Sequence, residues 1–255
     1  MAERGTGWLD EALHRASLRR WGGAARGAKA ARLSDLRRDQ VRARALRQKL
    51  DELLATAESR LAFSRIGSEA FAWPDGADWS WRPRLWRLPL DRKGLAGAGN
   101  RTPVGEEATL FHDCPLAEIA LRQVRNGREG DLAPFALRLE VLRFGGSFLS
   151  LAIDLPPEAC EGLRRRHLLR LDLSAAAEAP LRLFARLNVR HGPNAEAILR
   201  ELPLGEASAE FDLAPTEINE RRVERMWLDL IFEAPAMNQV TLRDLTFARL
   251  PRAEL

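Results

Sequence analysis

The sequence predicts a mainly β protein, an antiparallel β-sandwich or barrel preceded by an N-terminal helical arm. From residue 106 onward, apolar and polar residues alternate in short runs, as in strands with one buried face. Turn signals rich in Gly, Pro and Asn separate these runs without long helical periods between them, which favours antiparallel over parallel strands. Residues 28–63 instead repeat their apolar side chains at helical spacing and are rich in good helix formers.

Residues 1–63 are interpreted as a basic helical arm whose long helix spans about residues 28–63. A short heptad pattern runs through this helix, with its apolar positions at Leu36, Ala43, Leu46, Leu50, Leu53 and Ala57. The pattern predicts either self-association as a coiled coil, giving a homo-oligomer, or packing of the same stripe along the β domain.

The positive charge of the chain is concentrated in this arm. The formal net charge is +4, but the segment from Arg15 to Lys49 holds twelve Arg or Lys and only two acids, Asp35 and Asp39. Such an excess predicts an anionic partner, either anionic lipid headgroups or nucleic acid, or else a solvated helix face. No nucleic-acid reading motif accompanies the charge, so a nucleic-acid-associated protein is the weaker alternative.

Cysteine usage and the N-terminus predict a compartment. Cys114 and Cys160 are too few for a disulfide framework, the chain begins without an apolar leader, and no stretch approaches the ~18 apolar residues of a membrane span. The predicted location is cytoplasmic, with peripheral membrane contact through the arm as an alternative.

Residues 64–105 are a transition rich in Gly, Pro and Trp. Four of the seven Trp lie here, at Trp73, Trp79, Trp81 and Trp86. A rigid aromatic group of this kind favours packing on the sandwich, whereas an exposed group would suit sugar stacking or partner binding. The Gly-rich run at 95–105 lacks the Lys and the spacing of a phosphate loop, so nucleotide binding is not expected.

The sandwich is expected to occupy residues 106–255. Its clearest strand is 223–233, where Met226, Leu228, Leu230 and Phe232 alternate on a core face. The alternation of the last strand slips by one residue, which predicts a bulge near Arg243-Asp244. Gly145-Gly146 is expected to close a tight hairpin, and a short helix is expected at 158–165 or 195–200.

A ligand site is predicted on the outward faces of strands 181–190 and 223–233. If the two strands share a sheet, that face combines aromatic, guanidinium, carboxylate and amide groups, which suits the ring faces and hydroxyls of a sugar. The candidate ligand-binding residues are Trp227, Asp229, Glu233, Arg186 and Asn188, with Arg190, His191 and Asn194 at the strand end and turn. The alternative is an outer face covered by the Trp-rich segment or by the long helix, with Trp227 buried beneath it.

Catalysis is not the favoured function. His112, Asp113 and Cys114 are adjacent in sequence, and neighbouring strand residues face opposite sides, so they form no ready triad. A carbohydrate-active hydrolase is the alternative, because acids at 210, 217, 220, 229 and 233 could supply a carboxylate pair across a cleft. We therefore expect a non-catalytic binding or scaffolding protein that recognises a glycan or a protein surface.

Two stretches resemble known proteins. The run WLDLIFEAPAMNQVTLRDLTFARLP resembles the closing strands of jelly-roll carbohydrate-binding modules and galactose-binding-like domains, which implies a jelly-roll-like sandwich. The wider part from FHDCPLAEIALRQVRNG through FARLNVRHGPN to the end of the sequence is similar to an uncharacterised alphaproteobacterial family of unknown function. The jelly-roll resemblance also implies a structural calcium ion held by Glu106, Glu107 and Asp244, since Ca²⁺ prefers several oxygen ligands.

Overall fold

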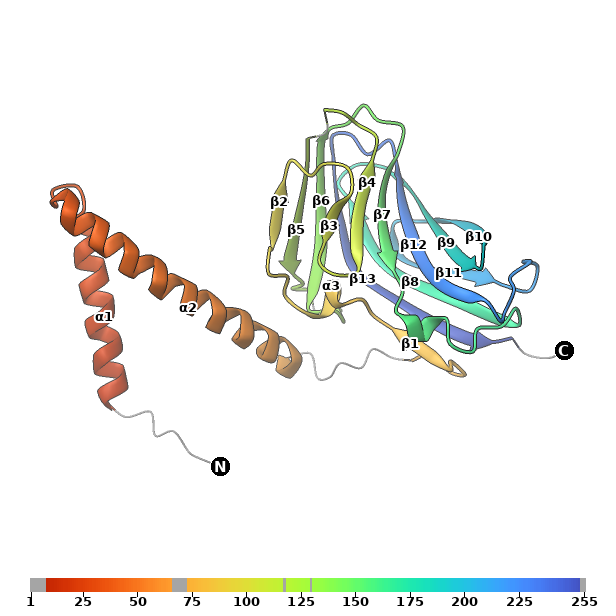
Figure 1. The fold of residues 1–255 in the computed structure, drawn as a ribbon, viewed down its shortest axis with the longest axis horizontal. Coiled ribbons are helices and arrows are strands. Elements are labelled where there is room, and N and C mark those ends of the chain that lie inside the picture. Colours follow the sequence, from red (N-terminus) through yellow and green to blue (C-terminus); the bar gives the residue numbers. More distant parts are fainter. Residues whose placement is uncertain (1–7, 66–72, 117, 129, 253–255) are drawn as a thin grey trace. The chain divides into compact units, whose positions relative to one another are not determined.

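The computed structural model describes residues 8–65, 73–116, 118–128 and 130–252 of the 255-residue chain (Figure 1). The chain divides into two compact units, Met1–Ala57 and Glu58–Leu255. The first unit is helical, and the second contains all the described strands.

The arm consists of two helices, α1 (Trp8–Gly27) and α2 (Leu33–Arg65). The long helix therefore begins five residues later than predicted, and the segment before it is a helix in its own right. Gly27 ends α1, as glycine commonly does. Asp35 lies in the first turn of α2, where negative charge is favourable, and accepts a 2.6 Å hydrogen bond from Nη2 of Arg38. No helix among the described residues is long and apolar enough to cross a membrane.

The second unit is an antiparallel β-sandwich whose two layers face each other (Figure 1). Sheet A has the order β11-β8-β13-β6-β5-β2, with β1 added beside β13. Its strands are β1 (Trp79–Trp81), β2 (Gly94–Ala96), β5 (Glu118–Arg125), β6 (Phe135–Arg143), β8 (His167–Ala177), β11 (Gly205–Asp212) and β13 (Asn238–Pro251). Sheet B has the order β10-β9-β12-β7-β4-β3. Its strands are β3 (Thr102–Val104), β4 (Ala108–His112), β7 (Leu149–Asp154), β9 (Arg182–His191), β10 (Asn194–Leu202) and β12 (Val223–Glu233).

From β6 onward the chain passes repeatedly from one sheet to the other, as in a jelly roll. The predicted fold class is thereby confirmed. Two local predictions were wrong. Gly145-Gly146 does not close a hairpin, because β6 belongs to sheet A and the following β7 to sheet B. Residues 195–200 lie in strand β10 rather than in a helix, and near 158–165 only a short 3₁₀ turn forms, at Pro157–Ala159.

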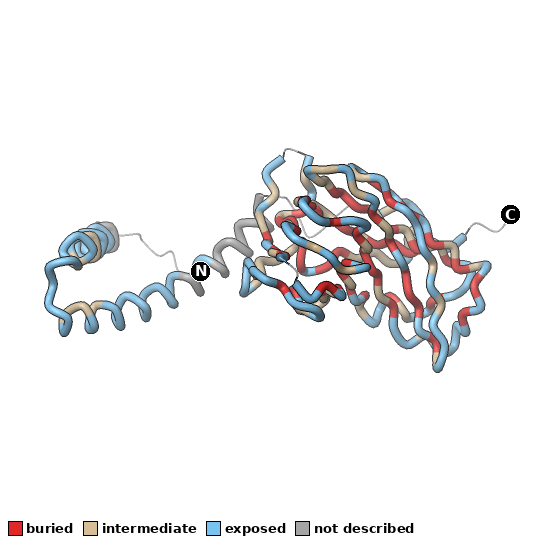
Figure 2. Tube along the Cα trace, turned by 90° about the horizontal axis from the view of Figure 1, so that it is seen from above, coloured by how far each residue is buried: buried red, intermediate tan, exposed pale blue. Residues whose placement is uncertain are grey.

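The core lies between the two sheets, where buried and exposed positions alternate along the strands (Figure 2). The four predicted core residues of β12 are all at most 1% exposed. The predicted bulge is also present, because the pairing of β13 with β8 shifts register between Leu242 and Asp244. The side-chain amide of Asn126 donates to the carbonyl of Arg243 at 2.8 Å and so secures the bulged backbone.

The Trp-rich transition is part of the sandwich, so the sandwich begins earlier than residue 106. Strand β1 pairs with β13, and the short helix α3 (Arg84–Arg87) places Trp86 in the core, where it is 0% exposed. Trp79 and Trp81 are half-buried and stack with ring centroids 6.5 Å apart, whereas Trp73 is 55% exposed. The segment is therefore mainly structural.

A buried histidine at the start of β8 links stability to pH. His167 is 4% exposed and its Nδ1 accepts a hydrogen bond from the backbone N–H of Arg164 at 3.0 Å. Burial lowers its pKa from 6.5, an effect that Asp78 opposes and Arg249 reinforces. Since the unfolded chain then binds the proton more readily, the stability that neutral His167 contributes is lost as pH falls below about 6.5.

We therefore expect the free energy of unfolding to fall more steeply between pH 7.5 and pH 5 in the wild type than in His167→Gln. Glutamine keeps a hydrogen-bond acceptor and does not titrate. Urea unfolding at several pH values measures the difference, and parallel pH profiles for the two proteins would exclude this role of His167.

Candidate binding face on sheet B

Strands β9 and β12 are neighbours in sheet B, so the premise of the predicted ligand site is confirmed. Their antiparallel register pairs Asp229 with Arg186, Trp227 with Asn188 and Glu233 with Arg182. These side chains alternate with core residues such as Leu187 and therefore lie on the outer face. Five of the predicted ligand-binding residues, Arg186, Asn188, Trp227, Asp229 and Glu233, are thus brought together on one surface.

Asp229 is the centre of a hydrogen-bonded network on this face. Its Oδ2 accepts hydrogen bonds from Nε and Nη2 of Arg186, at 3.1 and 2.8 Å, and from Nδ2 of Asn188 at 2.9 Å. Asp229 and Asn188 are each only 6% exposed, whereas Arg186 is open to solvent. The hydrogen bonds found among the described residues leave Oδ1 of Asp229 without a donor, so this oxygen is available to a ligand hydroxyl.

Trp227 lies directly beside this network and is half-buried. The guanidinium carbon of Arg225 is 5.3 Å from its ring centroid, and Arg225 is in turn paired with Asp154 on the adjacent strand β7. The Trp-rich segment does not cover the ring, because β1 pairs with sheet A. The alternative in which the Trp-rich segment covers this face is therefore wrong.

The same face continues into a hollow of about 370 Å³ at the opposite end of β12. Its lining includes Phe184, Ile231 and Phe148, of which Phe148 is 42% exposed. At its margin Arg182 donates to Glu233 at 2.9 Å and to Glu201 at 3.0 Å. Phe184 and Ile231 lie on the outer face because they alternate with core residues along β9 and β12. Phe148 joins them only because β7 lies next to β12, which no local pattern reveals.

The strand-end residues are divided between the two faces of the sheet. Arg190 is exposed on the outer face, 3.4 Å from Glu224, and Asn194 is exposed at the start of β10. His191 is 5% exposed and its Nδ1 accepts from the backbone N–H of Asn219 at 3.3 Å. The prediction that His191 lines a ligand cleft is therefore wrong, because it follows the inward alternation of Leu187 and Val189.

The three carboxylates assigned to calcium have arginine or backbone partners. Asp244 accepts hydrogen bonds from Nε and Nη2 of Arg82, Glu106 pairs with Arg84, and Glu107 accepts the backbone N–H of Arg84 at 2.7 Å. Across the part of the chain that the structure describes, no three His, Cys, Asp or Glu side chains are grouped as a metal site requires. The geometry gives the calcium assignment no support.

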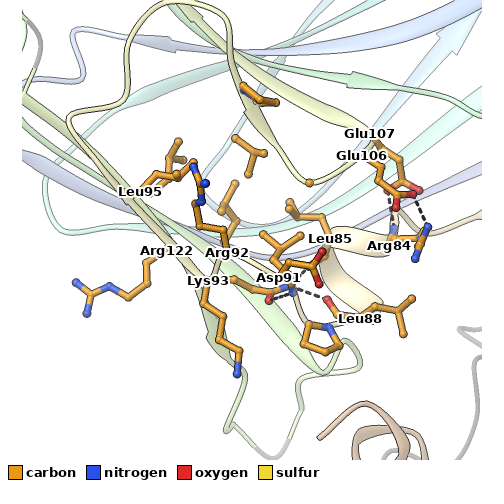
Figure 3. A pocket seen from close by; sticks show the side chains of 18 residues that line it. Arg84, Leu85, Leu88, Asp91, Arg92, Lys93, Leu95, Glu106, Glu107 and Arg122 are labelled. Atoms are coloured by element: carbon orange, nitrogen blue, oxygen red, sulfur yellow. Dashed lines mark hydrogen bonds and ion pairs between the residues drawn. The ribbon is translucent and has the colours of Figure 1, made fainter. Parts of the chain in front are cut away.

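Glu107 borders a second cavity, of about 350 Å³, below the segment that follows α3 (Figure 3). The side-chain amide of Gln123 binds both α3 and the residue after it, by donating to the carbonyls of Leu85 and Leu88 at 2.7 and 2.8 Å. Burial raises the pKa of Glu107, although the hydrogen bond from Arg84 opposes the shift. Arg92 and Arg122 lie at the other end of the cavity (Figure 3). Sequence analysis did not identify this cavity, because its lining comes from four separate segments.

The adjacent residues His112, Asp113 and Cys114 have structural contacts. Asp113 accepts from the backbone N–H and the hydroxyl of Ser147, at 2.8 and 2.5 Å, and the hydroxyl bond lowers its pKa. His112 contacts the carbonyl of Ala98 at 3.1 Å, and Cys114 Sγ accepts the N–H of Gly145 at 3.2 Å. Asp113 thus orders the crossing between the sheets.

The acids considered for hydrolysis are also dispersed. Glu210 lies on β11 of sheet A, whereas Asp229 and Glu233 lie on β12 of sheet B. Glu220 accepts the backbone N–H of Arg165 at 2.7 Å. Glu210 is therefore in a different sheet from Asp229 and Glu233.

A family model described as a family of unknown function, DUF6478, matches residues 1–255, the whole chain. The chain belongs to this family. The match agrees with the resemblance to an uncharacterised family that the sequence suggested. No curated protein matches the sequence.

Several solved structures are similar to part of this chain. The family 11 carbohydrate-binding module from Clostridium thermocellum, in complex with a mixed-linked tetrasaccharide, is 7% identical, with 64% of this chain and 97% of the module covered and a TM-score of 0.36. TmCBM61 in complex with β-1,4-galactotriose is 15% identical, with 60% of this chain and 92% of TmCBM61 covered and a TM-score of 0.34. The enzymatically active domain of bacteriophage CBA120 tailspike protein 4 is 10% identical, with a TM-score of 0.39; 55% of this chain is covered, but only 19% of the tailspike.

Proposed function

We propose that the outer face of sheet B binds an oligosaccharide without catalysing its cleavage. One observation carries the proposal: a half-buried tryptophan, Trp227, lies beside a carboxylate, Asp229, that Arg186 and Asn188 hold in place on the outer face of the sheet. An aromatic ring beside oriented polar groups is the arrangement that sugars require, since their ring faces are apolar and their hydroxyls both donate and accept.

Each member of the group has a distinct role in this proposal. The face of Trp227 stacks on a sugar ring. Oδ1 of Asp229 accepts a hydrogen bond from a sugar hydroxyl, and the exposed guanidinium of Arg186 donates one to a sugar oxygen. Because Oδ2 of Asp229 is already fixed by three hydrogen bonds, little side-chain entropy is lost when the ligand binds.

The extent of the face favours a chain of sugars over a single residue. Trp227 and Ile231 are four residues apart on β12, which corresponds to about 13 Å along a strand. Phe184, paired with Ile231, and Phe148 supply further aromatic area at that end, next to the hollow. We therefore propose an elongated ligand that lies along β12, with Trp227 at one end and the hollow at the other.

Affinity electrophoresis of the full-length protein through gels that contain soluble polysaccharides tests this function. The wild type should be retarded by at least one polysaccharide, and Trp227→Ala should lose at least ten-fold in affinity, since truncating an aromatic hot-spot residue commonly costs ~2 kcal/mol. If no polysaccharide retards the folded protein, glycan binding is contradicted, and a protein surface becomes the ligand to test.

A further inference from the structure

Within the helical unit taken by itself, the described part of the arm carries large apolar side chains that the rest of that unit leaves exposed. On α2, Leu46, Leu50, Leu53 and Leu54 are 39%, 48%, 63% and 54% exposed. Figure 2 shows the described residues of α1 and α2 as predominantly exposed along the arm. Exposed leucines grouped on one element commonly mark an interaction surface, because water favours their removal from solvent.

These leucines form a single stripe. They are spaced four, three and one residues apart, and at 3.6 residues per turn this spacing places all four within one face of the helix. Ala43, seven residues before Leu50, extends the same face toward the N-terminus. The helix therefore has a leucine stripe, defined here as Ala43, Leu46, Leu50, Leu53 and Leu54.

Basic residues flank the leucine stripe on both sides. Helical geometry places Arg42 and Lys49 along one flank and Arg44 and Arg47 along the other. Long basic side chains beside an apolar face can cover the apolar surface with their stems while their charges reach outward. The helix thus combines an apolar stripe with a positively charged border.

This charge pattern disfavours a second copy of the helix as the occupant of the stripe. In a parallel coiled coil with Ala43 and Leu50 at the first core position, Arg42 of one helix faces Arg47 of the other, and the pair repeats on both sides. Two like-charged contacts per dimer oppose self-association. Nucleic acid would satisfy the charges but would leave the leucine stripe in water.

An anionic lipid surface satisfies both features. A helix that lies in the membrane interface buries its apolar face among the acyl chains, and its basic flanks meet the headgroups. We propose that α2 docks on an anionic lipid bilayer through the leucine stripe, with Arg42, Lys49, Arg44 and Arg47 on the lipid phosphates. This proposal does not depend on glycan binding by the sandwich.

Flotation of the full-length protein with phosphatidylcholine vesicles, with and without phosphatidylglycerol, tests the proposal. We expect recovery with the anionic vesicles and at least ten-fold weaker binding to the neutral ones. Arg42→Gln/Arg44→Gln/Arg47→Gln should weaken binding about 100-fold, at about five-fold per basic residue near an anionic surface. Leu46→Gln/Leu50→Gln/Leu53→Gln keeps the charge and good helix formers, and should lose at least ten-fold.

Val41→Gln is the matched control. Val41 is also apolar and 69% exposed, but it lies nine residues from Leu50, on the opposite side of the helix. The Val41→Gln protein should bind anionic vesicles as strongly as the wild type does. Equal binding of the wild type to neutral and anionic vesicles would overturn the proposal. So would undiminished binding of Leu46→Gln/Leu50→Gln/Leu53→Gln to the anionic vesicles. A stable dimer in sedimentation velocity that the leucine variant dissociates would also overturn it, because the stripe would then belong to a second copy.

Discussion

Replacement of Arg82 by methionine is expected to lower the free energy of unfolding by about 3–5 kcal/mol, the usual cost of removing one partner of a buried ion pair. Arg82 is 4% exposed and binds Asp244 with both Nε and Nη2, at 2.8 and 2.7 Å. Burial raises the pKa of Asp244, while the Arg82 guanidinium opposes that rise. Without the guanidinium, a carboxylate remains in a site that disfavours its charge.

Urea unfolding of the full-length protein measures this loss, and Arg122→Met is the matched control. Arg122 donates to Glu140 at 3.0 Å, but its side chain is 57% exposed, so its loss should cost less than about 1 kcal/mol. The difference in the free energy of unfolding between the wild type and Arg82→Met should become smaller as pH falls, since protonation of Asp244 removes the buried charge. A loss no larger than that of the control would show that the buried pair does not stabilise the sandwich.

Trp86→Ala is expected to have a similar effect, about 3–5 kcal/mol, as for other large-to-small core substitutions. Trp86 is 0% exposed, and its Nε1 donates to the carbonyl of Leu242 at 3.0 Å, next to the bulge of β13. The substitution leaves a cavity and deprives a buried carbonyl of its donor.

Two comparisons separate these contributions. Trp86→Phe keeps most of the side-chain volume but loses the indole N–H donor. Its free energy of unfolding should therefore lie between those of Trp86→Ala and the wild type. Trp73→Ala removes a tryptophan that is 55% exposed and should change stability by no more than about 0.5 kcal/mol. If Trp86→Ala lowers the free energy of unfolding no more than Trp73→Ala does, the transition segment is not an integral part of the core.

The fold class could be predicted from sequence because period-two alternation directly reports which residues face the core. The same reasoning located the β13 bulge, since a one-residue slip in the pattern must be absorbed in the backbone. Strand β10 was missed because Ala, Glu, Leu and Arg favour helix, and its pairing with β9 overrides that propensity. The Gly145-Gly146 crossing was mistaken for a hairpin because alternation does not show which sheet a strand joins.

The candidate site was partly predictable for the same reason. Alternation placed Arg186, Asn188, Trp227 and Asp229 on outward faces, and the adjacency of β9 and β12 brought them together. Phe148 could not be assigned to this face, because its position depends on the long-range pairing of β7 with β12. The resemblance implied a calcium site, but Arg82 fills the coordination of Asp244 that an ion would need.

A glycan array probed with full-length wild type, Trp227→Ala and Trp73→Ala tests the central claim most directly. Both substitutions remove a tryptophan with solvent-accessible surface, but only Trp227 lies on the outer face of sheet B. We predict that the wild type and Trp73→Ala bind the same saccharides and that Trp227→Ala binds none of them. Saccharide binding that survives Trp227→Ala would contradict this face as the sugar site.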